Sequence, residues 1–458
     1  MRPYGLPMHT TLASGLVDWE KLTGQSKLVV DLVSIPIFSA IAGVITNWTG
    51  VIMLFAPVRF HGFHCPGLKT IFPFLPRKVQ ILPTFAPGGI LGFQGFIPAR
   101  AEKMASICAD KGFSLVGNIS DFYKQLDPDG IAEQLVLLMQ PEVRTMVDGL
   151  MEREHPQFWA DLPSPLKEVV YQRVAQRLPG IAHRAFEALG ENIDHLIDVK
   201  LLTVNYLRRH PEVLVDFIKD LGAKELKFMV RVGFEVGGPL GLLLALFLQV
   251  KHSIPLISAV PSSVFVIFGA ALIGIIVNII AIKVVFEPGL PAPRYRYIWK
   301  QAKFAKRQHE AAKSFAASMA YRVLTLPNLA NELLHGPRAQ QTRRLLETVL
   351  ASEMDDILGP VRGVVRVAVG TKEYDAIRSG TATAVLDFAP ALVGDADFSK
   401  RQAKKIHKFA TKKLRALPPD EFMVMLYSAI EQDAWLLYLH GGLLGFAVGF
   451  IHLLLFGS

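Results

Sequence analysis

Cysteine is almost absent from this chain, which has 458 residues but only two thiols, Cys65 and Cys108. Two cysteines do not form a disulfide framework, so we expect both to stay reduced and to face the cytoplasm. Charged residues are also scarce, at 19%, whereas hydrophobic residues make up 51%. This composition is too apolar for an ordinary soluble protein and too charged for one that lies wholly in lipid. We therefore expect membrane segments joined by water-exposed helices.

The sequence also lacks the motifs of well-known enzyme classes. It contains neither G-x-S-x-G nor H-E-x-x-H. The glycines of residues 88–95 (GGILGFQG) resemble a phosphate-binding loop, but no predicted strand precedes them and no Lys-Ser/Thr pair follows. We therefore predict no enzymatic activity, no nucleotide binding and no cofactor.

Histidine and cysteine offer only a weak indication of a metal. The segment HGFHC contains His61, His64 and Cys65, but a zinc site needs four ligands and no C-x-x-C pair is present to complete the set. We expect an interfacial loop here rather than a metal site. His440 and His452 lie in an apolar segment, where we expect them to face protein or headgroups, with a proton-linked role as the alternative.

Long apolar runs without charge occur at residues 32–58, 253–282 and 434–458. Each can cross a hydrocarbon core of about 30 Å, which takes roughly 20 helical residues. A fourth run contains Glu235 as its only charge. We predict an all-α integral membrane protein with four transmembrane helices, at residues 30–58, 230–250, 259–284 and 434–457.

Two parts of the sequence repeat. Residues 43–57 (GVITNWTGVIMLFAP) return 231 residues later as GIIVNIIAIKVVFEP, at residues 274–288. Three glycines near residue 237 match three near residue 445 at an offset of 208. Such periods indicate a tandem duplication. With four spans, both copies have the same orientation, which predicts two parallel repeats related by a pseudo-twofold axis along the membrane normal.

Glycines and asparagines within the spans should hold the helices together. Glycines spaced by four residues share one bare helix face, which lets a backbone of the same chain or of a second copy approach closely, so a homo-oligomer is one alternative. The glycines expected at such contacts are Gly233, Gly237, Gly241, Gly441, Gly445 and Gly449. Asn47 and Asn278 should hydrogen-bond another helix, or each other. Alternatively, these amides and Glu235 line a path for a substrate or ion.

The net charge is +9, and the basic residues cluster beside the spans. Lys and Arg concentrate after the first and third spans and before the fourth, which predicts that these segments are cytoplasmic and that both termini lie outside. A cation near anionic lipid contributes about 1 kcal/mol, so we favour lipid headgroups over nucleic acid as the partner. The residues expected at headgroups are Arg59, Arg77, Lys78, Arg100, Arg294, Arg296 and Lys300.

The remaining segments should be connectors and helical cytoplasmic domains. Residues 1–29 form an N-terminal segment that does not look like a cleaved signal. Residues 59–100 form a basic connector, within which the Pro- and Gly-rich residues 79–99 should lie on or dip into the membrane. Residues 101–229 and 285–432 should contain the helical domains of the two repeats.

One helix in the first of these domains is predicted in detail. Apolar residues from Leu166 to Leu178 share one helix face after Pro165. Pro179 and Gly180 should end this helix. No strand-like alternation is long enough to predict a sheet.

Two motifs resemble a known family. TNWTGVIMLFAP (residues 46–57) and GFQGFIPARAEKMA (residues 92–105) look like those of the YjiN/YheB-like proteins, an uncharacterised bacterial membrane family with a domain of unknown function. The resemblance covers the chain from about residue 30 to its glycine-rich end. It implies a multi-pass protein of the bacterial inner membrane and no particular activity. The second copy has no Gly-Phe-Gln-Gly counterpart, so a ligand of that element would bind once per chain.

These features together predict a non-enzymatic scaffold or envelope-maintenance protein. It would contact a bilayer with anionic headgroups through its basic interfacial segments. The alternative is a transporter or lipid-moving conduit whose path lies near the intramembrane asparagines.

Overall fold

The computed structural model describes residues 16–17, 19–74, 84–86, 89–293, 299–358, 366, 370–386, 394–431 and 433–457. Helices dominate these residues, which confirms the all-α prediction. The chain forms two compact units. Unit 1 comprises Met1–Cys108, Leu207–Ala311 and Leu417–Ser458, and unit 2 comprises Ala109–Tyr206 and Ala312–Ala416.

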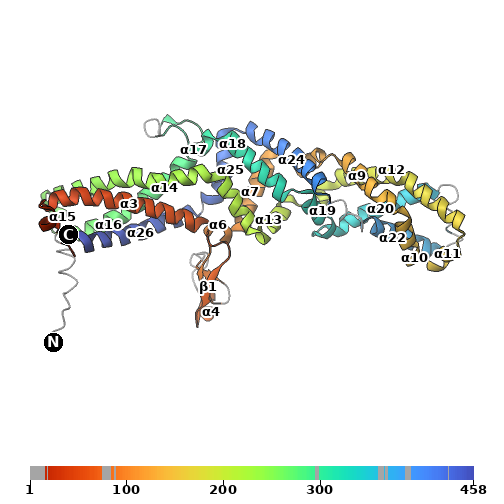
Figure 1. The fold of residues 1–458 in the computed structure, drawn as a ribbon, viewed down its shortest axis with the longest axis horizontal. Coiled ribbons are helices and arrows are strands. Elements are labelled where there is room, and N and C mark those ends of the chain that lie inside the picture. Colours follow the sequence, from red (N-terminus) through yellow and green to blue (C-terminus); the bar gives the residue numbers. More distant parts are fainter. Residues whose placement is uncertain are drawn as a thin grey trace. The chain divides into compact units, whose positions relative to one another are not determined.

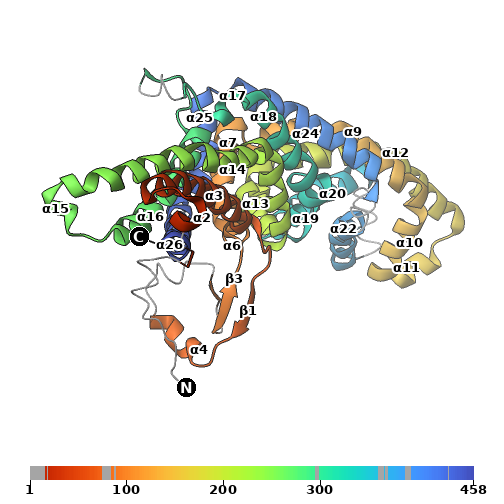
Figure 2. The same ribbon diagram turned by 60° about the vertical axis from the view of Figure 1, so that its left-hand side comes forward.

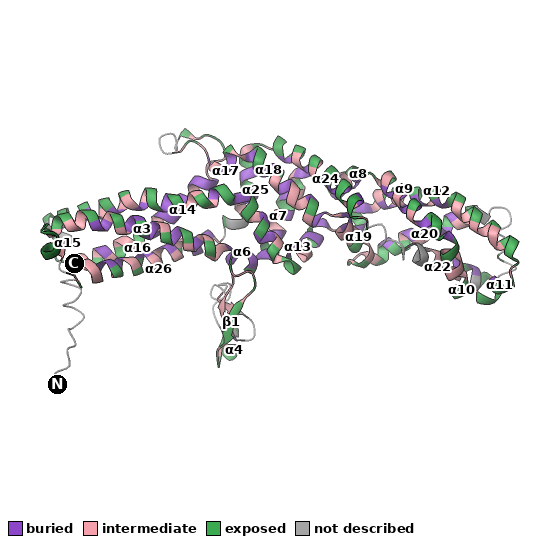
Figure 3. Cartoon of the chain, viewed as in Figure 1, coloured by how far each residue is buried: buried purple, intermediate pink, exposed green. Residues whose placement is uncertain are grey.

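Four helices of unit 1 are long and apolar enough to cross a membrane. They are α3 (Lys27–Phe55), α14 (Pro211–Val250), α16 (Ser262–Phe286) and α26 (Ala434–Phe456). These helices lie side by side in Figure 1. Their outward faces are exposed in Figure 3 and carry large apolar side chains such as Ile41, Phe268 and Leu443. An apolar exposed surface of this extent suits contact with lipid tails.

Three of the four predicted spans agree with their helices to within a few residues at each end. The exception is the second, because residues 230–250 are only the latter part of the 40-residue helix α14. Its earlier part buries Leu214, Phe217 and Leu221 on one face. This buried face continues past Glu225 to Val232 in the span, so the helix does not end where the charged residues begin.

The helices α3 and α16 end in the same local structure. Ala56 caps α3 with φ −130° and ψ 144°, and Glu287 caps α16 with φ −127° and ψ 144°. In both places the proline after the cap residue accepts a backbone hydrogen bond at its carbonyl. The donor is the residue that directly precedes a short helix of four residues. Gly95 N–H donates to the Pro57 carbonyl, and Ala302 N–H donates to the Pro288 carbonyl, each at 2.9 Å. The two short helices are α6 (Phe96–Ala99) and α17 (Lys303–Lys306).

A small antiparallel sheet lies in the first connector, beside α4 (Figure 2). Its strands are β1 (His61–His64), β2 (Phe85–Ala86) and β3 (Ile90–Phe93), in the order β1-β3-β2. The sequence did not predict this sheet, because strands of two to four residues carry too little alternation. Gly62 pairs with Gly92, and a Cβ on Gly62 would collide with the β3 backbone. The predicted membrane-dipping segment, residues 79–99, is thus partly sheet, with residues 79–83 and 87–88 outside the described part.

Short elements complete unit 1. They are α2 (Trp19–Thr23), α4 (Leu68–Ile71), η1 (Phe72–Phe74), η3 (Lys251–Ser253), α15 (Pro255–Ser258) and α25 (Pro419–Glu431). Helices α7 (Ala101–Val116), α13 (Val199–Arg209) and α18 (Gln308–Ser318) carry the chain between the units.

The regular elements of unit 2 are all helical among its described residues. Its elements are α8 (Ile119–Gln125), α9 (Pro128–Met139), η2 (Gln140–Glu142), α10 (Val143–Glu154), α11 (Pro156–Asp161), α12 (Ser164–Leu196), η5 (Met319–Val323), α19 (Leu326–His335), α20 (Ala339–Leu358), α22 (Thr371–Leu386) and α24 (Ala396–Ala416). Helix α12 packs against α9 and α20.

The prediction that Pro179 and Gly180 end a helix is wrong. Helix α12 continues through Pro179 to Leu196. A proline inside a helix removes one backbone hydrogen bond, but an apolar face offsets that loss here. The buried residues of this face are Leu178, Ala182, Ala185, Leu189, Ile193 and Leu196, at steps of three or four.

Candidate membrane-edge site

The glycines of α14 face α3. A Cβ on Gly233 would collide with the backbone of Gly43. A Cβ on Gly237 would lie 2.6 Å from the Ser39 carbonyl oxygen, and one on Gly241 would lie 2.9 Å from Pro36 Cα. The two helices are antiparallel, and their backbones touch along this face because it carries no side chains.

Helices α16 and α26 make the equivalent contact. A Cβ on Gly441 would collide with the Gly274 backbone, and one on Gly445 with the Ala270 backbone. A Cβ on Gly449 would lie 3.0 Å from Ile267 Cα. All six predicted glycines therefore face a helix of the same chain.

The two asparagines of the candidate spans each join a pair of these helices. Asn47 is buried in α3, and its Nδ2 donates to the Met229 carbonyl of α14. Asn278 is buried in α16, and its Nδ2 donates to the Leu437 carbonyl of α26. The alternative in which the amides bond each other is wrong, because each reaches the backbone of its neighbouring helix.

Three other polar residues of the spans, Glu235, His440 and His452, also have protein partners. Glu235 Oε1 lies 2.7 Å from Arg231 Nε one turn earlier on α14, and the glutamate side chain is 45% exposed. This carboxylate lies on an outward face. Two histidines of α26 face α3, since His452 Nε2 lies 3.0 Å from Ser34 Oγ and His440 Nε2 lies 3.1 Å from Thr49 Oγ1.

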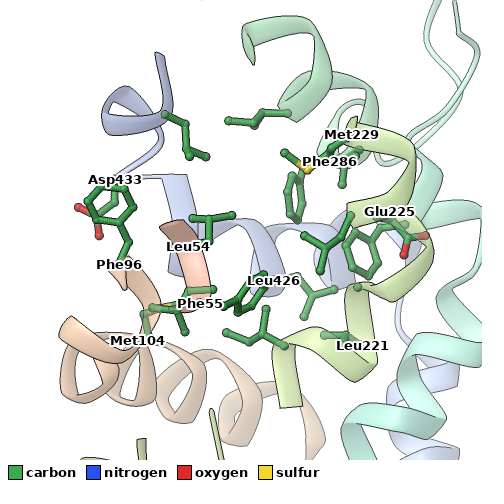
Figure 4. Close-up of a pocket in the computed structure, with 18 of the residues that line it drawn as sticks. Leu54, Phe55, Phe96, Met104, Leu221, Glu225, Met229, Phe286, Leu426 and Asp433 are labelled. Carbon is green, nitrogen blue, oxygen red and sulfur yellow. The ribbon is translucent and has the colours of Figure 1, made fainter. Parts of the chain in front are cut away.

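A cavity of about 90 Å³ lies where the ends of α3, α16 and α26 meet an interior stretch of α14 and the helices α6, α7, α17 and α25 (Figure 4). Its walls are almost entirely apolar. They include Phe55 at the end of α3 and Phe286 at the matching end of α16. The acidic side chains among its lining residues are Glu225 and Asp433. We call this space the junction cavity.

Both acids are paired with an arginine from the other half of the chain. Arg100 follows α6, and its Nη1 lies 3.0 Å from Asp433 Oδ1. Arg307 follows α17, and its Nη1 donates to Glu225 Oε1 at 2.6 Å. Each half thus supplies one arginine to the other half and receives one in return.

The surroundings of these arginines explain their pKa shifts. Burial lowers the pKa of Arg100, although Asp433 opposes this effect. Hydrogen bonds to Glu310 and then to Glu225 raise the pKa of Arg307. Arg100 was expected at lipid headgroups, but it is buried against Asp433. The headgroup prediction for this residue is therefore wrong, because the arginine closes an internal ion pair.

An open cleft of about 450 Å³ lies between α14 and α17. We call it the basic cleft, and its cations are Lys224, Lys227, Arg231, Lys303, Lys306 and Arg307. Lys303 Nζ also lies 4.0 Å from the centre of the Phe228 ring. Among the described residues, Lys227, Lys303 and Lys306 form no ion pair with an acid. The cleft therefore carries a surplus of positive charge.

The position of the basic cleft is as informative as its charge. Arg231 lies at the beginning of the predicted second span, residues 230–250, directly before its apolar run. The lysines of α14 were missed because they are interspersed with acids. Their spacing was an available signal, since positions 224, 227 and 231 share one helix face.

Two other predicted headgroup residues lie away from the basic cleft. Arg59 and Lys300 are exposed and do not line it. Arg77, Lys78, Arg294 and Arg296 lie outside the described residues. His61 and His64 are exposed on β1, and no group of three metal-binding side chains occurs in the described part of the chain.

Comparisons with known proteins give no relative. No protein-family model matches the chain, and neither the curated proteins nor the solved structures include a significant match.

Proposed function

We propose that this chain is a non-enzymatic scaffold of the bacterial inner membrane that binds anionic lipid headgroups in the basic cleft. The observation that carries this proposal is the surplus of cations directly beside the apolar part of α14. Lysine and arginine at the edge of a membrane attract anionic headgroups. The apolar helix faces next to the cleft would hold the acyl chains of the same lipids.

The proposed architecture is a head-to-tail duplication. The matched caps of α3 and α16 support it, as do the two equivalent asparagine bonds. The antiparallel pair α3 and α14 would then be one repeat and α16 and α26 the other, in parallel orientation. The exchanged arginines would lie on either side of the pseudo-twofold axis.

The proposed orientation follows from the same cations. The ends of the spans beside the basic cleft would face the cytoplasm, because positively charged segments stay on that side. Unit 2 and the polar part of unit 1 would then be cytoplasmic. The YjiN/YheB-like motifs support a bacterial inner membrane.

The geometry favours this function over a conduit through the spans. A path along Asn47 and Asn278 would need amides free to contact a solute, but both donate to backbone carbonyls. Glu235 points outward and pairs with Arg231. The spans also touch closely through glycine.

The test uses the full chain in nanodiscs of phosphatidylcholine, with and without phosphatidylglycerol, and measures bound lipid by native mass spectrometry after gentle release. Lys227→Glu/Lys303→Glu should weaken phosphatidylglycerol binding at least about thirtyfold, since each lysine contributes about 1 kcal/mol. Lys111→Glu/Lys124→Glu makes the same change of charge at exposed sites of helices α7 and α8 and should leave binding unchanged. Equal retention of phosphatidylglycerol by the cleft and control variants would refute the proposal.

A further inference from the structure

Unit 2 contains a separate apolar cavity of about 430 Å³. Helices α10, α11, α12, α20 and α22 form its walls. Representative lining residues are Leu150, Val170, Val174, Met354 and Ile377. Its volume lies in the range of about 300–1,000 Å³ that is typical of small-molecule sites.

Helix α12 contributes one of its faces to the wall of this cavity. One face of the helix, which includes Ala182 and Leu189, is buried against the rest of unit 2. The first turns present another apolar row to the cavity, and within it Leu166 is 52% and Val169 is 45% exposed. These two residues mark the opening. Large apolar residues that are exposed side by side usually mark a surface that a ligand or partner covers when it binds.

The polar groups in the wall are mostly bound elsewhere. Glu353 accepts from Arg184, and the Tyr374 hydroxyl donates to Asp355 at 2.7 Å. Trp159 Nε1 donates to Asp148 at 2.9 Å. The walls therefore offer a ligand carbon surfaces rather than hydrogen bonds.

A positive charge stands at the cavity. Arg173 lines it and is exposed, and it makes no ion pair among the described residues. Four methionines also line the cavity, and flexible thioether chains adapt to a ligand without a fixed shape. The lining residues are Met139, Met146, Met151 and Met354.

We infer that this cavity binds one acyl chain of a membrane lipid, with the anionic end of the lipid at Arg173. An acyl chain is apolar, flexible and without hydrogen-bonding groups, as the walls require. Its carboxylate or phosphate end complements the guanidinium. The same polypeptide carries four helices suited to a membrane, so lipid is the ligand most available to it. This inference is independent of the basic cleft, which lies in unit 1.

The experiment uses full-length protein in nanodiscs and two photoactivatable probes, a diazirine palmitate and a phosphatidylglycerol with the diazirine on its acyl chain. Cross-linked peptides are identified by mass spectrometry. We expect saturable labelling of α10, α12 or α20 by one of the probes, and the labelling probe shows whether the source is a free fatty acid or a phospholipid. Labelling confined to the four long helices with both probes would refute the inference.

Variants make the test specific. Val170→Trp fills the cavity and should lower unit 2 labelling at least tenfold, whereas Val424→Trp adds the same ring at an exposed site and should not. Arg173→Glu should also weaken labelling, and Arg177→Glu, one turn further along α12 and not in the cavity wall, should leave it intact. Thermal unfolding must show that each variant is folded.

The outcomes separate this inference from the proposed function. Lys227→Glu/Lys303→Glu should not change labelling of unit 2, even where it abolishes headgroup binding. Equal labelling of Val170→Trp and wild type would overturn the acyl-chain site while leaving the basic cleft unaffected. Cross-links from the cavity residues of unit 2 to a second copy of the chain, with no cross-links to lipid, would also overturn it.

Discussion

Arg307 Nη1 donates to both carboxylate oxygens of Glu225, at 2.6 and 2.7 Å, and the glutamate side chain is only 3% exposed. The two residues come from different halves of the chain. Arg100 and Asp433 make the reciprocal ion pair. The two halves are therefore joined by exchanged charges as well as by apolar packing at the junction cavity.

Removal of one member of this pair should be costly. Arg307→Met leaves Glu225 buried without its cation, which should lower the free energy of unfolding by about 3–5 kcal/mol. Chemical unfolding of the protein in detergent micelles measures the change.

The double variant Arg307→Met/Glu225→Leu provides the control, because it removes the buried charge as well. It should recover much of the lost stability. A double variant as unstable as Arg307→Met would show that the ion pair is not the cause.

Two adjacent glycines of α14 should respond differently to alanine. A Cβ on Gly237 would lie 2.6 Å from the Ser39 carbonyl oxygen, so Gly237→Ala should separate α3 from α14 and cost about 1–3 kcal/mol. Gly238→Ala is the matched control, since its nearest neighbour would be Ala40 Cβ at 3.7 Å. Thermal unfolding should show a lower midpoint for Gly237→Ala alone, and equal midpoints would contradict close packing at this face.

The ion pairs around Glu310 should make stability depend on pH. Hydrogen bonds from Arg307 and then Lys224 lower the pKa of Glu310 to about 2, from an ordinary value of 4.5. The unfolded chain thus binds a proton at higher pH than the folded one. The stabilisation is complete above the ordinary pKa and is lost as the pH falls towards 2.

Glu310→Gln should therefore lower the unfolding midpoint at neutral pH, and this effect should shrink below about pH 4.5 and vanish only as the pH reaches about 2. Glu133→Gln, at an exposed site without an ion pair among the described residues, serves as the control. A Glu310→Gln effect that is equal at all pH values would exclude this linkage.

The two cysteines should differ in reactivity although both are half-buried. Burial raises the pKa of the Cys108 thiol, which lines the junction cavity, to about 12. A rise from the ordinary value of 9.0 lowers the thiolate fraction about a thousandfold. Iodoacetamide should therefore modify Cys65 first, and mass spectrometry of digested protein should find Cys108 unmodified in the folded state. Rapid modification of Cys108 would contradict this effect of burial.

The sequence predicted the features that depend on local composition. Runs of apolar residues were enough to find the four long helices, because length and hydropathy decide whether a helix can cross a membrane. The glycine spacing placed three residues on one face, but the structure was needed to identify α3 and α16 as the helices they meet. The short strands and the passage of α12 through Pro179 were missed, since tertiary contacts outweigh local preference in both.

The candidate site was harder to predict because its parts are distant in sequence. Lys227 and Lys303 meet only after α14 and α17 have packed. Arg100 looked like a headgroup contact because its charge lies near a span, but its partner Asp433 is at the far end of the chain. Charge and position alone do not separate an internal ion pair from a surface cation.

The length of α14 has a mechanical consequence. At 1.5 Å per residue its 40 residues extend about 60 Å, roughly twice the thickness of a hydrocarbon core. Beyond Pro211, the stretch before the apolar run contains no proline, so in the proposed orientation the helix would leave the membrane as one continuous rod. If the four long helices tilted in response to bilayer thickness, the polar first part of α14 would move further than its apolar part. Membrane strain would thus be converted into displacement in the aqueous phase.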